Sequence, residues 1–310
     1  MTLTLRKYKD DDDYWRIRDF LRQVFLLNDR RELSWQVARF DYWRWHGILN
    51  MNDSSLEDVS IWEADEGQIA AVLNPEGLGE AHFSIHPAFY TPGMAAEMVL
   101  AAEQSLAVTQ AQGGKKLTAW VNEHQAFLKD ALVQRGFTQS GYAETMHYRS
   151  LDAPILDAPP ANGYSVRSLG DGLELLERCY ASGLAFHEDD IHTARDNRDH
   201  PHWYRNIQTA PLYRRDLDIV AIALDGAVAS FCTIWFDDHT RSAYFEPVAT
   251  VPTHQRRGLG KAVMCEGLRR LKRMGATQAF VGSYSPEAHA LYASVGFTEY
   301  DLLEAWNKIL

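Results

Sequence analysis

Residues 246–274 combine a strand-like stretch, a glycine-bearing turn and an amphipathic helix, and this run constrains the chain more than any other. The turn contains two arginines together with Gly258, Gly260 and Lys261. The helix that follows has these apolar positions on one side: Val263, Met264, Gly267, Leu268, Leu271 and Met274. The first N–H groups of a helix lack partners within it and favour negative charge, so the run predicts a phosphate-binding turn.

The glycine spacing separates several kinds of phosphate loop. A Walker loop requires G-x-x-x-x-G-K-[ST], whereas Lys261 is followed by alanine. A dinucleotide fingerprint requires G-x-G-x-x-G, whereas valine stands at the position of the last glycine. The pattern that is present, Q-x-x-G-x-G in residues 255–260, resembles the acyl-CoA pyrophosphate loop of the GNAT N-acyltransferase superfamily. The resemblance implies that acetyl-CoA is a co-substrate.

A second motif downstream strengthens this resemblance. Members of the superfamily commonly show N-x-x-A-x-x-L-Y-x-x-x-G-F after the helix. Here Ala288, Leu291–Tyr292 and Gly296–Phe297 match, while Ser285 or a neighbour stands where asparagine is usual, with slightly shifted spacing. The two motifs have the right order and separation, and the resemblance extends from about residue 164 to the C-terminus.

Composition sets further limits on the function. A chain of 310 residues with 46% hydrophobic residues can form two globular domains with cores of their own. The net charge of -11 argues against a nucleic-acid partner. The three cysteines show no metal or disulfide spacing, so no metal is expected. No apolar leader or membrane-length segment is apparent, so we expect a cytoplasmic protein with no membrane partner.

The chain contains a weak internal repeat with an offset of about 160 residues, which is the size of a domain. Each half begins with a short strand-like segment and a helical stretch, contains an acidic-glycine turn, and carries Gly-Phe-Thr near its end. Residues 151–162 are proline-rich and lack periodicity, which is typical of a linker. We therefore expect an α/β (α+β) fold of two tandem GNAT-like domains, 1–150 and 163–310. Each would have a central mixed, mostly antiparallel sheet flanked by helices.

The first copy lacks the features of a phosphate loop. The corresponding segment, His86–Met94, has one glycine and no arginine or lysine, and Pro92 removes a backbone donor. The Leu-Tyr pair is also missing before Gly136–Phe137. We expect this degenerate domain to have a structural role or to supply a wall of the substrate site, without turning over acyl-CoA.

The resemblance implies which residues hold the acyl-CoA. Backbone groups of the strand would pair with the pantetheine arm, and the loop would hold the pyrophosphate. The implied binding residues are Val248, Ala249, Thr250, Gln255, Arg256, Arg257, Gly258, Leu259, Gly260, Lys261, Ser285 and Ala288. The alternative for the basic loop residues is a solvated surface, which is the preferred interpretation for the four cations at 269, 270, 272 and 273.

Two residues are candidates for proton transfer. The resemblance places Tyr292 beside the CoA sulfur, where its hydroxyl can protonate the leaving thiolate; alternatively, Tyr292 is a core aromatic. Glu246 interrupts an apolar strand, so burial would raise the pKa of its carboxyl group and allow it to accept a proton from the attacking amine. The alternative, held equally, is that Glu246 orders the strand by hydrogen bonding.

Residues 186–202 carry several acidic and histidine side chains without a compact zinc pattern. In the resembled fold this region covers the acceptor, and its acidic character favours a cationic acceptor. An aromatic cluster in residues 35–46 is best explained by packing.

These observations predict an N-acetyltransferase that transfers an acetyl group to an amine of a small molecule or peptide. The amine would attack directly in a ternary complex, and the chemistry would take place in the C-terminal domain. Two alternatives stay open: a non-catalytic acyl-CoA sensor, and a transferase that uses another acyl donor. A monomer that forms an internal pseudo-dimer of its two domains is one expected state.

Overall fold

The computed structural model describes residues 3–51, 53–111, 113–187 and 190–310. The chain divides into two compact units. The N-terminal unit comprises residues 1–145 and 301–310, and the C-terminal unit comprises residues 146–300. The domain boundaries expected from the sequence remain a prediction; the structure adds that the last ten residues group with the N-terminal unit.

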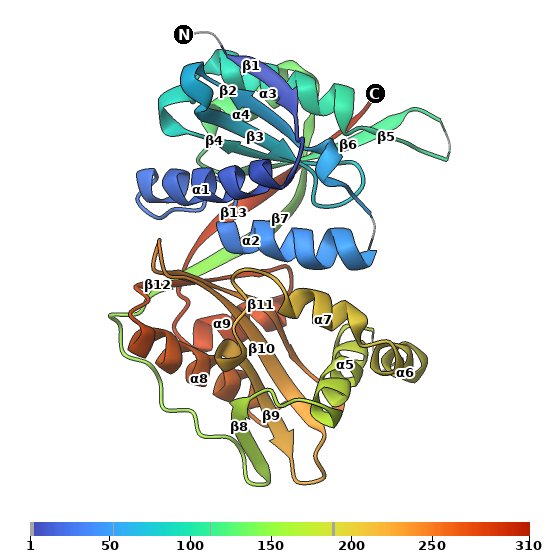
Figure 1. The fold of residues 1–310 in the computed structure, drawn as a ribbon, viewed down its shortest axis with the longest axis vertical. Coiled ribbons are helices and arrows are strands. Elements are labelled where there is room, and N and C mark those ends of the chain that lie inside the picture. Colours follow the sequence, from blue (N-terminus) through green and yellow to red (C-terminus); the bar gives the residue numbers. More distant parts are fainter. Residues whose placement is uncertain (1–2, 52, 112, 188–189) are drawn as a thin grey trace. The chain divides into compact units, whose positions relative to one another are not determined.

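The N-terminal unit has a mixed sheet. Its strands are β1 (Thr4–Lys7), β2 (Ser60–Glu63), β3 (Ile69–Asn74), β4 (Glu80–Ile85), β5 (Val108–Thr109), β6 (Lys115–Asn122) and the first part of β7 (Thr138–Ser150). Its helices are α1 (Asp11–Leu27), α2 (Val37–Tyr42), a π-helical segment (Trp43–Met51), α3 (Pro92–Ser105) and α4 (Ala126–Gln134). Strands β1 to β4 pair antiparallel in sequence, and β4 pairs parallel with β6. Figure 1 shows these elements in blue to green.

The C-terminal unit repeats this order of elements. Its strands are β8 (Tyr164–Ser168), β9 (Asp218–Ala223), β10 (Val228–Asp237), β11 (Ser242–Thr250) and β12 (Gln278–Ser283). Its helices are α5 (Leu173–Phe186), α6 (Ile191–Asp199), α7 (His202–Gln208), α8 (Leu259–Met274) and α9 (Pro286–Ser294). Strands β8 to β11 pair antiparallel in sequence, and β11 pairs parallel with β12. The mixed, mostly antiparallel sheets predicted from the sequence are therefore confirmed.

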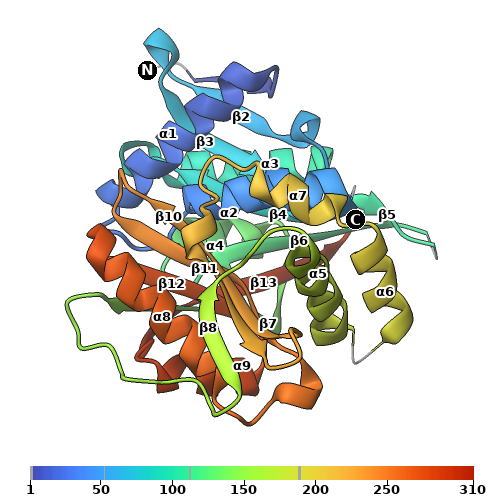
Figure 2. The same cartoon turned by 60° about the horizontal axis from the view of Figure 1, so that its bottom comes forward.

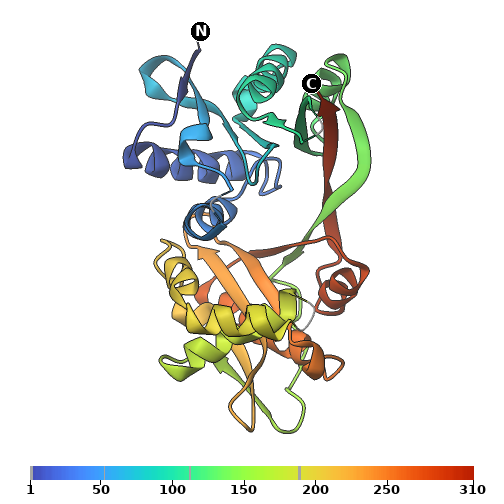
Figure 3. The ribbon, with the colours of Figure 1, turned by 90° about the vertical axis from the view of Figure 1, so that its right-hand side faces the viewer.

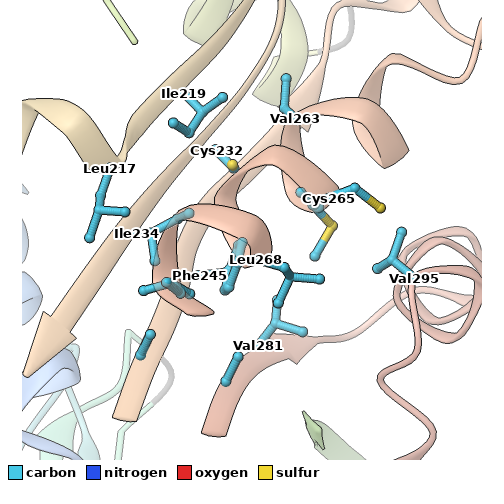
Figure 4. Packing of buried hydrophobic residues seen from close by; sticks show 14 of the residues in the cluster. Leu217, Ile219, Cys232, Ile234, Phe245, Val263, Cys265, Leu268, Val281 and Val295 are labelled. Carbon is cyan, nitrogen blue, oxygen red and sulfur yellow. The ribbon is translucent and has the colours of Figure 1, made fainter. Parts of the chain in front are cut away.

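Helices cover both faces of the C-terminal sheet. Figures 1 and 2 show α8 and α9 on one face and α5 to α7 on the other. The core beneath α8 includes Cys232, Ile234 and Phe245 from the strands and Val263 and Leu268 from the helix (Figure 4). This is the apolar stripe that the sequence predicted for the helix after the turn.

Two strands link the units. Strand β7 begins in the N-terminal unit and ends in the C-terminal unit, whereas β13 (Glu299–Ile309) runs from the C-terminal unit into the N-terminal one. Figure 3 follows β7 in green and β13 in red. Within the N-terminal unit β13 pairs antiparallel with β6, from Leu303 opposite Asn122 to Ile309 opposite Lys116. Each unit thus has a terminal strand that comes from the other half of the sequence.

Candidate active site

Strand β11 is paired along one edge, whereas its other edge is paired only in its first part. It pairs with β10 along most of its length, up to Thr250 opposite Ser230. Its parallel pairing with β12 covers only three residues and ends at Tyr244 opposite Phe280. From Phe245 onward the backbone on this side pairs with no other strand among the described residues. A free strand edge offers N–H and C=O groups to an extended ligand.

A bulge lies where the two strands part. The register between β10 and β11 shifts so that Glu246 and Pro247 together lie opposite Thr233. The backbone oxygen of Glu246 accepts a hydrogen bond from the indole of Trp235 at 2.6 Å. Bulges of this kind redirect side chains next to functional sites. Phe245 belongs to the α8-facing core, so alternation places the half-buried Glu246 side chain on the α5 face of the sheet.

The turn after β11 leads into helix α8, whose N-terminus has no side-chain cap. Arg256 and Gly258 have positive φ angles of 61° and 74°, and α8 begins at Leu259. Gly258 provides no side-chain cap, and the first turn of α8 contains no acidic residue. The N–H groups of Leu259, Gly260 and Lys261 are therefore available to an anion. A Cβ atom at Gly258 would have nothing within 4 Å, so the approach is open.

Packing holds this turn against the end of β11. Leu259 is buried in the core, and the Gln255 amide donates a 3.2 Å hydrogen bond to the backbone oxygen of Thr250. A Cβ at Gly260 would lie 3.3 Å from the Thr250 hydroxyl and 3.2 Å from Leu291 of α9. Glycine at 260 thus brings β11, the turn and α9 together, which positions the helix N-terminus beside the free strand edge.

The basic side chains of the turn differ in their contacts. Arg257 donates to the hydroxyl of Tyr164 at 2.9 Å, and the same hydroxyl contacts His254 Nδ1 at 2.8 Å. Arg256 and Lys261 make no hydrogen bond or ion pair with other described residues, which leaves their charges available to phosphate. Farther along α8, the side chains of residues 269 and 270 form ion pairs with Glu266 and so have structural partners.

Helix α9 presents the candidate acid. Ser285 caps the helix by accepting a 3.2 Å hydrogen bond from the N–H of Ala288, so its hydroxyl is already used within the protein. Tyr292 is buried, with its ring 5.8 Å from His147 and 6.4 Å from Phe297. No sequence motif pointed to His147, because it lies on β7, before the linker and outside the two matched motifs. Burial, reinforced by the neighbouring charge of a second histidine, lowers the pKa of His147 to about 4.

The N-terminal unit has the corresponding gap between strands. Strand β4 pairs with β6 over three residues, ending at His82 opposite Trp120. Beyond this point the segment 32–34 connects the two strands. The Ser34 hydroxyl accepts the N–H of Ile85 at 3.2 Å. The side chains of Asn122 and Gln125 donate to the backbone oxygens of residues 32 and 33 at 3.2 and 2.7 Å. The free edge of β4 is thus partly occupied by the chain itself.

The helix after this gap is capped as well. The hydroxyl of Thr91 accepts the N–H of Met94 at 3.2 Å, and Pro92 occupies the first helical turn of α3. An anion would have to displace this cap. The contrast with α8 gives a structural reason for the predicted loss of the phosphate loop in the first copy.

Two groups of side chains in the N-terminal unit have the composition of a metal site: Glu76, Glu80 and His82, and Glu123, His124 and Asp301. In the first group His82 Nδ1 accepts the indole N–H of Trp35 at 3.1 Å, so the neutral ring carries its proton on Nε2. Glu76 also pairs with Arg39 at 2.6 Å. These contacts are those of a buried hydrogen-bond network.

None of the described helices is both long and apolar enough to cross a membrane.

Comparisons with known proteins agree with this geometry. Residues 176–297 match the model of the acetyltransferase (GNAT) family. Mycothiol acetyltransferase of Pseudarthrobacter chlorophenolicus is 22% identical over 274 residues, which cover 81% of this chain and 80% of that protein. Mycothiol acetyltransferase of Paenarthrobacter aurescens is 23% identical over 252 residues, which cover 79% and 74%.

Solved structures share the fold over the whole chain. A tandem GNAT protein from the clavulanic acid biosynthesis pathway superimposes with a TM-score of 0.65 at 14% identity, covering 99% of this chain and 98% of that one. A GCN5-related N-acetyltransferase from Sphaerobacter thermophilus gives a TM-score of 0.62 at 16% identity, with coverage of 99% and 95%. The predicted tandem arrangement is therefore confirmed at the level of the fold.

Proposed function

Because residues 176–297 match the model of the acetyltransferase (GNAT) family, we propose that the protein transfers an acetyl group from acetyl-CoA to an amine and that the chemistry takes place in the C-terminal unit. The observation that carries the proposal is the uncapped N-terminus of α8 beside the free edge of β11. The helix N-terminus suits a pyrophosphate, and the strand edge suits an extended amide-containing arm.

The proposed binding residues follow from this placement. Backbone groups of Val248 to Thr250 would hold the pantetheine arm, and the N–H groups of Leu259 to Lys261 would hold the pyrophosphate. The positive φ angles of Arg256 and Gly258 shape the turn around it. Ser285 and Ala288 would act through their place at the start of α9, since the serine hydroxyl already serves as the helix cap.

The proposed chemistry is a direct attack without a covalent enzyme intermediate. The amine nitrogen forms a bond to the thioester carbonyl carbon while Glu246 takes the amine proton, directly or through water. The carbon–sulfur bond then breaks, and the hydroxyl of Tyr292 gives its proton to the leaving thiolate. Support for Glu246 comes from its position in the bulge beside the free strand edge. Support for Tyr292 comes from its place on α9, which packs against the turn through Leu291.

We infer that only the C-terminal unit binds acetyl-CoA. The gap in the N-terminal unit contains the segment 32–34, and its following helix is capped by Thr91. Isothermal titration of the full chain should therefore give one acetyl-CoA site. Two sites would overturn this inference, and no site would overturn the proposed function.

Turnover distinguishes a transferase from a sensor. With a panel of primary amines, Glu246→Gln should lower kcat by about 10²–10⁴-fold, the range for loss of a general base. Tyr292→Phe should also lower kcat, whereas the Kd of acetyl-CoA should change little in either variant. Binding without turnover of any amine would favour the sensor, and turnover only with longer acyl-CoA thioesters would favour another donor.

We propose that the reaction takes place in the cytoplasm, which is the compartment expected from the sequence. The cysteines at 179, 232 and 265 are free and buried, which is compatible with a reducing compartment.

A further inference from the structure

Arg178 of α5 is a buried cation without a hydrogen-bond partner. Its side chain is fully buried, and none of its three nitrogen atoms has an acceptor among the described residues. Five N–H donors are therefore unsatisfied. Buried charges in proteins are nearly always paired and hydrogen-bonded, because an unpaired one is strongly destabilising. The arginine therefore needs a partner that the folded chain does not supply.

Two aromatic rings contact the guanidinium of Arg178 and restrict the shape of a ligand that could bind it. Its central carbon lies 3.4 Å from the ring centroid of Phe231 and 4.6 Å from that of Tyr204. Stacking on a ring covers one face of the planar group and leaves its N–H donors pointing outward in the plane. A flat anion with two oxygen atoms matches this fork, since it can accept two parallel hydrogen bonds.

The nearest buried acid does not provide those bonds. Asp218 is fully buried and lies close enough for the charge of Arg178 to counteract the rise in its pKa that burial causes. Its carboxylate accepts hydrogen bonds from the hydroxyls of Tyr204 and Tyr213 at 2.8 and 2.7 Å. Asp218 balances part of the charge but leaves the guanidinium donors unsatisfied.

Arg178 lies on the same face of the sheet as the proposed base. Cys232 and Ile234 of β10 belong to the core beneath α8. Phe231 and Thr233, which alternate with them, therefore face α5. Since the Glu246 side chain also lies on that face, the arginine and the carboxylate are on one side of β10 and β11.

The strand register gives the separation of these two groups. Phe231, on which Arg178 stacks, pairs with Ala249, and Thr233 lies opposite the bulge that contains Glu246. The stacking site at Phe231 and the bulge at Glu246 are thus two residues apart along the strand direction and one strand apart across the sheet. These offsets give a separation of roughly 8 Å between the two sites. A small molecule with an amine at one end and an anion at the other can span this distance.

We propose that Arg178 binds a carboxylate of the acceptor, so that the acceptor is an amino acid-like molecule whose amine lies at Glu246. The inference rests on the proposed transferase function and narrows its substrate class. Arg178 holds the carboxylate in its plane, and the acceptor charge supplies the partner that the folded chain lacks.

Matched pairs of acceptors test this specificity. The probes are glycine, β-alanine and 4-aminobutyrate, each compared with its carboxamide, in steady-state assays with acetyl-CoA. At least one acid should exceed its amide in kcat/KM by about tenfold to a hundredfold, the factor expected for charge-assisted hydrogen bonds. Arg178→Met should reduce this ratio toward one. Arg273→Met is the matched control, because Arg273 of α8 is an exposed arginine outside the proposed site and its substitution removes the same charge; it should leave the ratio unchanged.

Thermal unfolding provides a readout that does not depend on turnover. Without acceptor, Arg178→Met removes the unsatisfied donors but also the charge that balances Asp218, so the quantity compared is the shift in unfolding temperature that each probe causes in each protein. The acid probes should stabilise the wild type and not Arg178→Met. An unchanged acid-to-amide ratio in Arg178→Met would overturn the proposal and assign Arg178 a structural role beside Asp218.

The two proposals fail in different ways. If acetyl-CoA binds but no probe is acetylated, thermal stabilisation by the acid probes still tests the role of Arg178. If the acid probes do not stabilise the wild type, the carboxylate site is rejected. If amides and acids are acetylated equally by the wild type, the transferase proposal stands and the carboxylate site is rejected.

Discussion

Gly258→Ala separates the two roles of the glycine at the start of α8. Gly258 has a φ of 74°, a left-handed conformation in which a residue with a Cβ is about 1 kcal/mol less stable. A Cβ there would have no atom within 4 Å, so the substitution introduces backbone strain without a clash. We expect a loss of about 1 kcal/mol in the free energy of unfolding and a fall in Tm of about 2–4 °C.

The effect on ligand binding should be larger than this strain. The new methyl group would occupy the open approach to the N–H groups of α8. Loss of one charge-assisted hydrogen bond is worth about 1.5–3 kcal/mol, which corresponds to roughly 10–100-fold weaker binding of acetyl-CoA.

Gly226→Ala is the matched control. Gly226 lies in the turn between β9 and β10, has a φ of 89°, and also has no atom within 4 Å of a Cβ position. It should therefore show a similar fall in Tm without a change in affinity. Scanning calorimetry gives Tm, and isothermal titration gives the Kd. If both variants lose the same stability and Gly258→Ala still binds acetyl-CoA as the wild type does, the assignment of this turn to the pyrophosphate is wrong.

Three further predictions concern stability. Gly267→Ala places a methyl group against the side chain of Ile234 in the core under α8 and should destabilise by about 1–3 kcal/mol in denaturant unfolding; an unchanged midpoint would show that the core is loosely packed there. His147 has a folded-state pKa of about 4, below its ordinary 6.5, so folding favours the neutral ring. Its contribution to the free energy of unfolding is therefore fully present above pH 6.5 and is lost as the pH falls toward 4. His147→Gln should flatten this part of the stability profile, and an identical profile would contradict it. Ser34→Ala leaves the buried N–H of Ile85 without its partner and should cost about 1–3 kcal/mol in thermal unfolding; a variant as stable as the wild type would show that the contact contributes nothing.

Local chemistry explains why the turn could be read from the sequence. Glycine at 258 adopts a left-handed conformation, and the apolar stripe of α8 faces the core, as a short stretch of sequence predicts. The internal repeat was also visible, because each half has the same order of strands and helices. The predicted roles of Glu246 and Tyr292 remain predictions, since their partners in the reaction are not part of the protein.

The strand topology could not be predicted from the sequence pattern. The free edge of β11 depends on where its pairing with β12 stops, and these strands are separated by the whole of α8. In the same way, the grouping of β13 with the N-terminal unit depends on its pairing with β6, about 190 residues earlier in the chain. Pairing between distant segments leaves no local signature in either strand.

The sequence by itself determined the glycine-bearing turn, the amphipathic helix after it and the duplicated order of elements, because helix periodicity and glycine conformation depend on near neighbours. Only the tertiary structure decided that segment 32–34 occupies the gap in the N-terminal unit, that His147 contacts Tyr292, and that Arg178 is buried without a hydrogen-bond partner among the described residues. Burial and hydrogen bonding between residues far apart in the chain are set by how the whole sheet and its helices pack, and they have no counterpart in a local pattern.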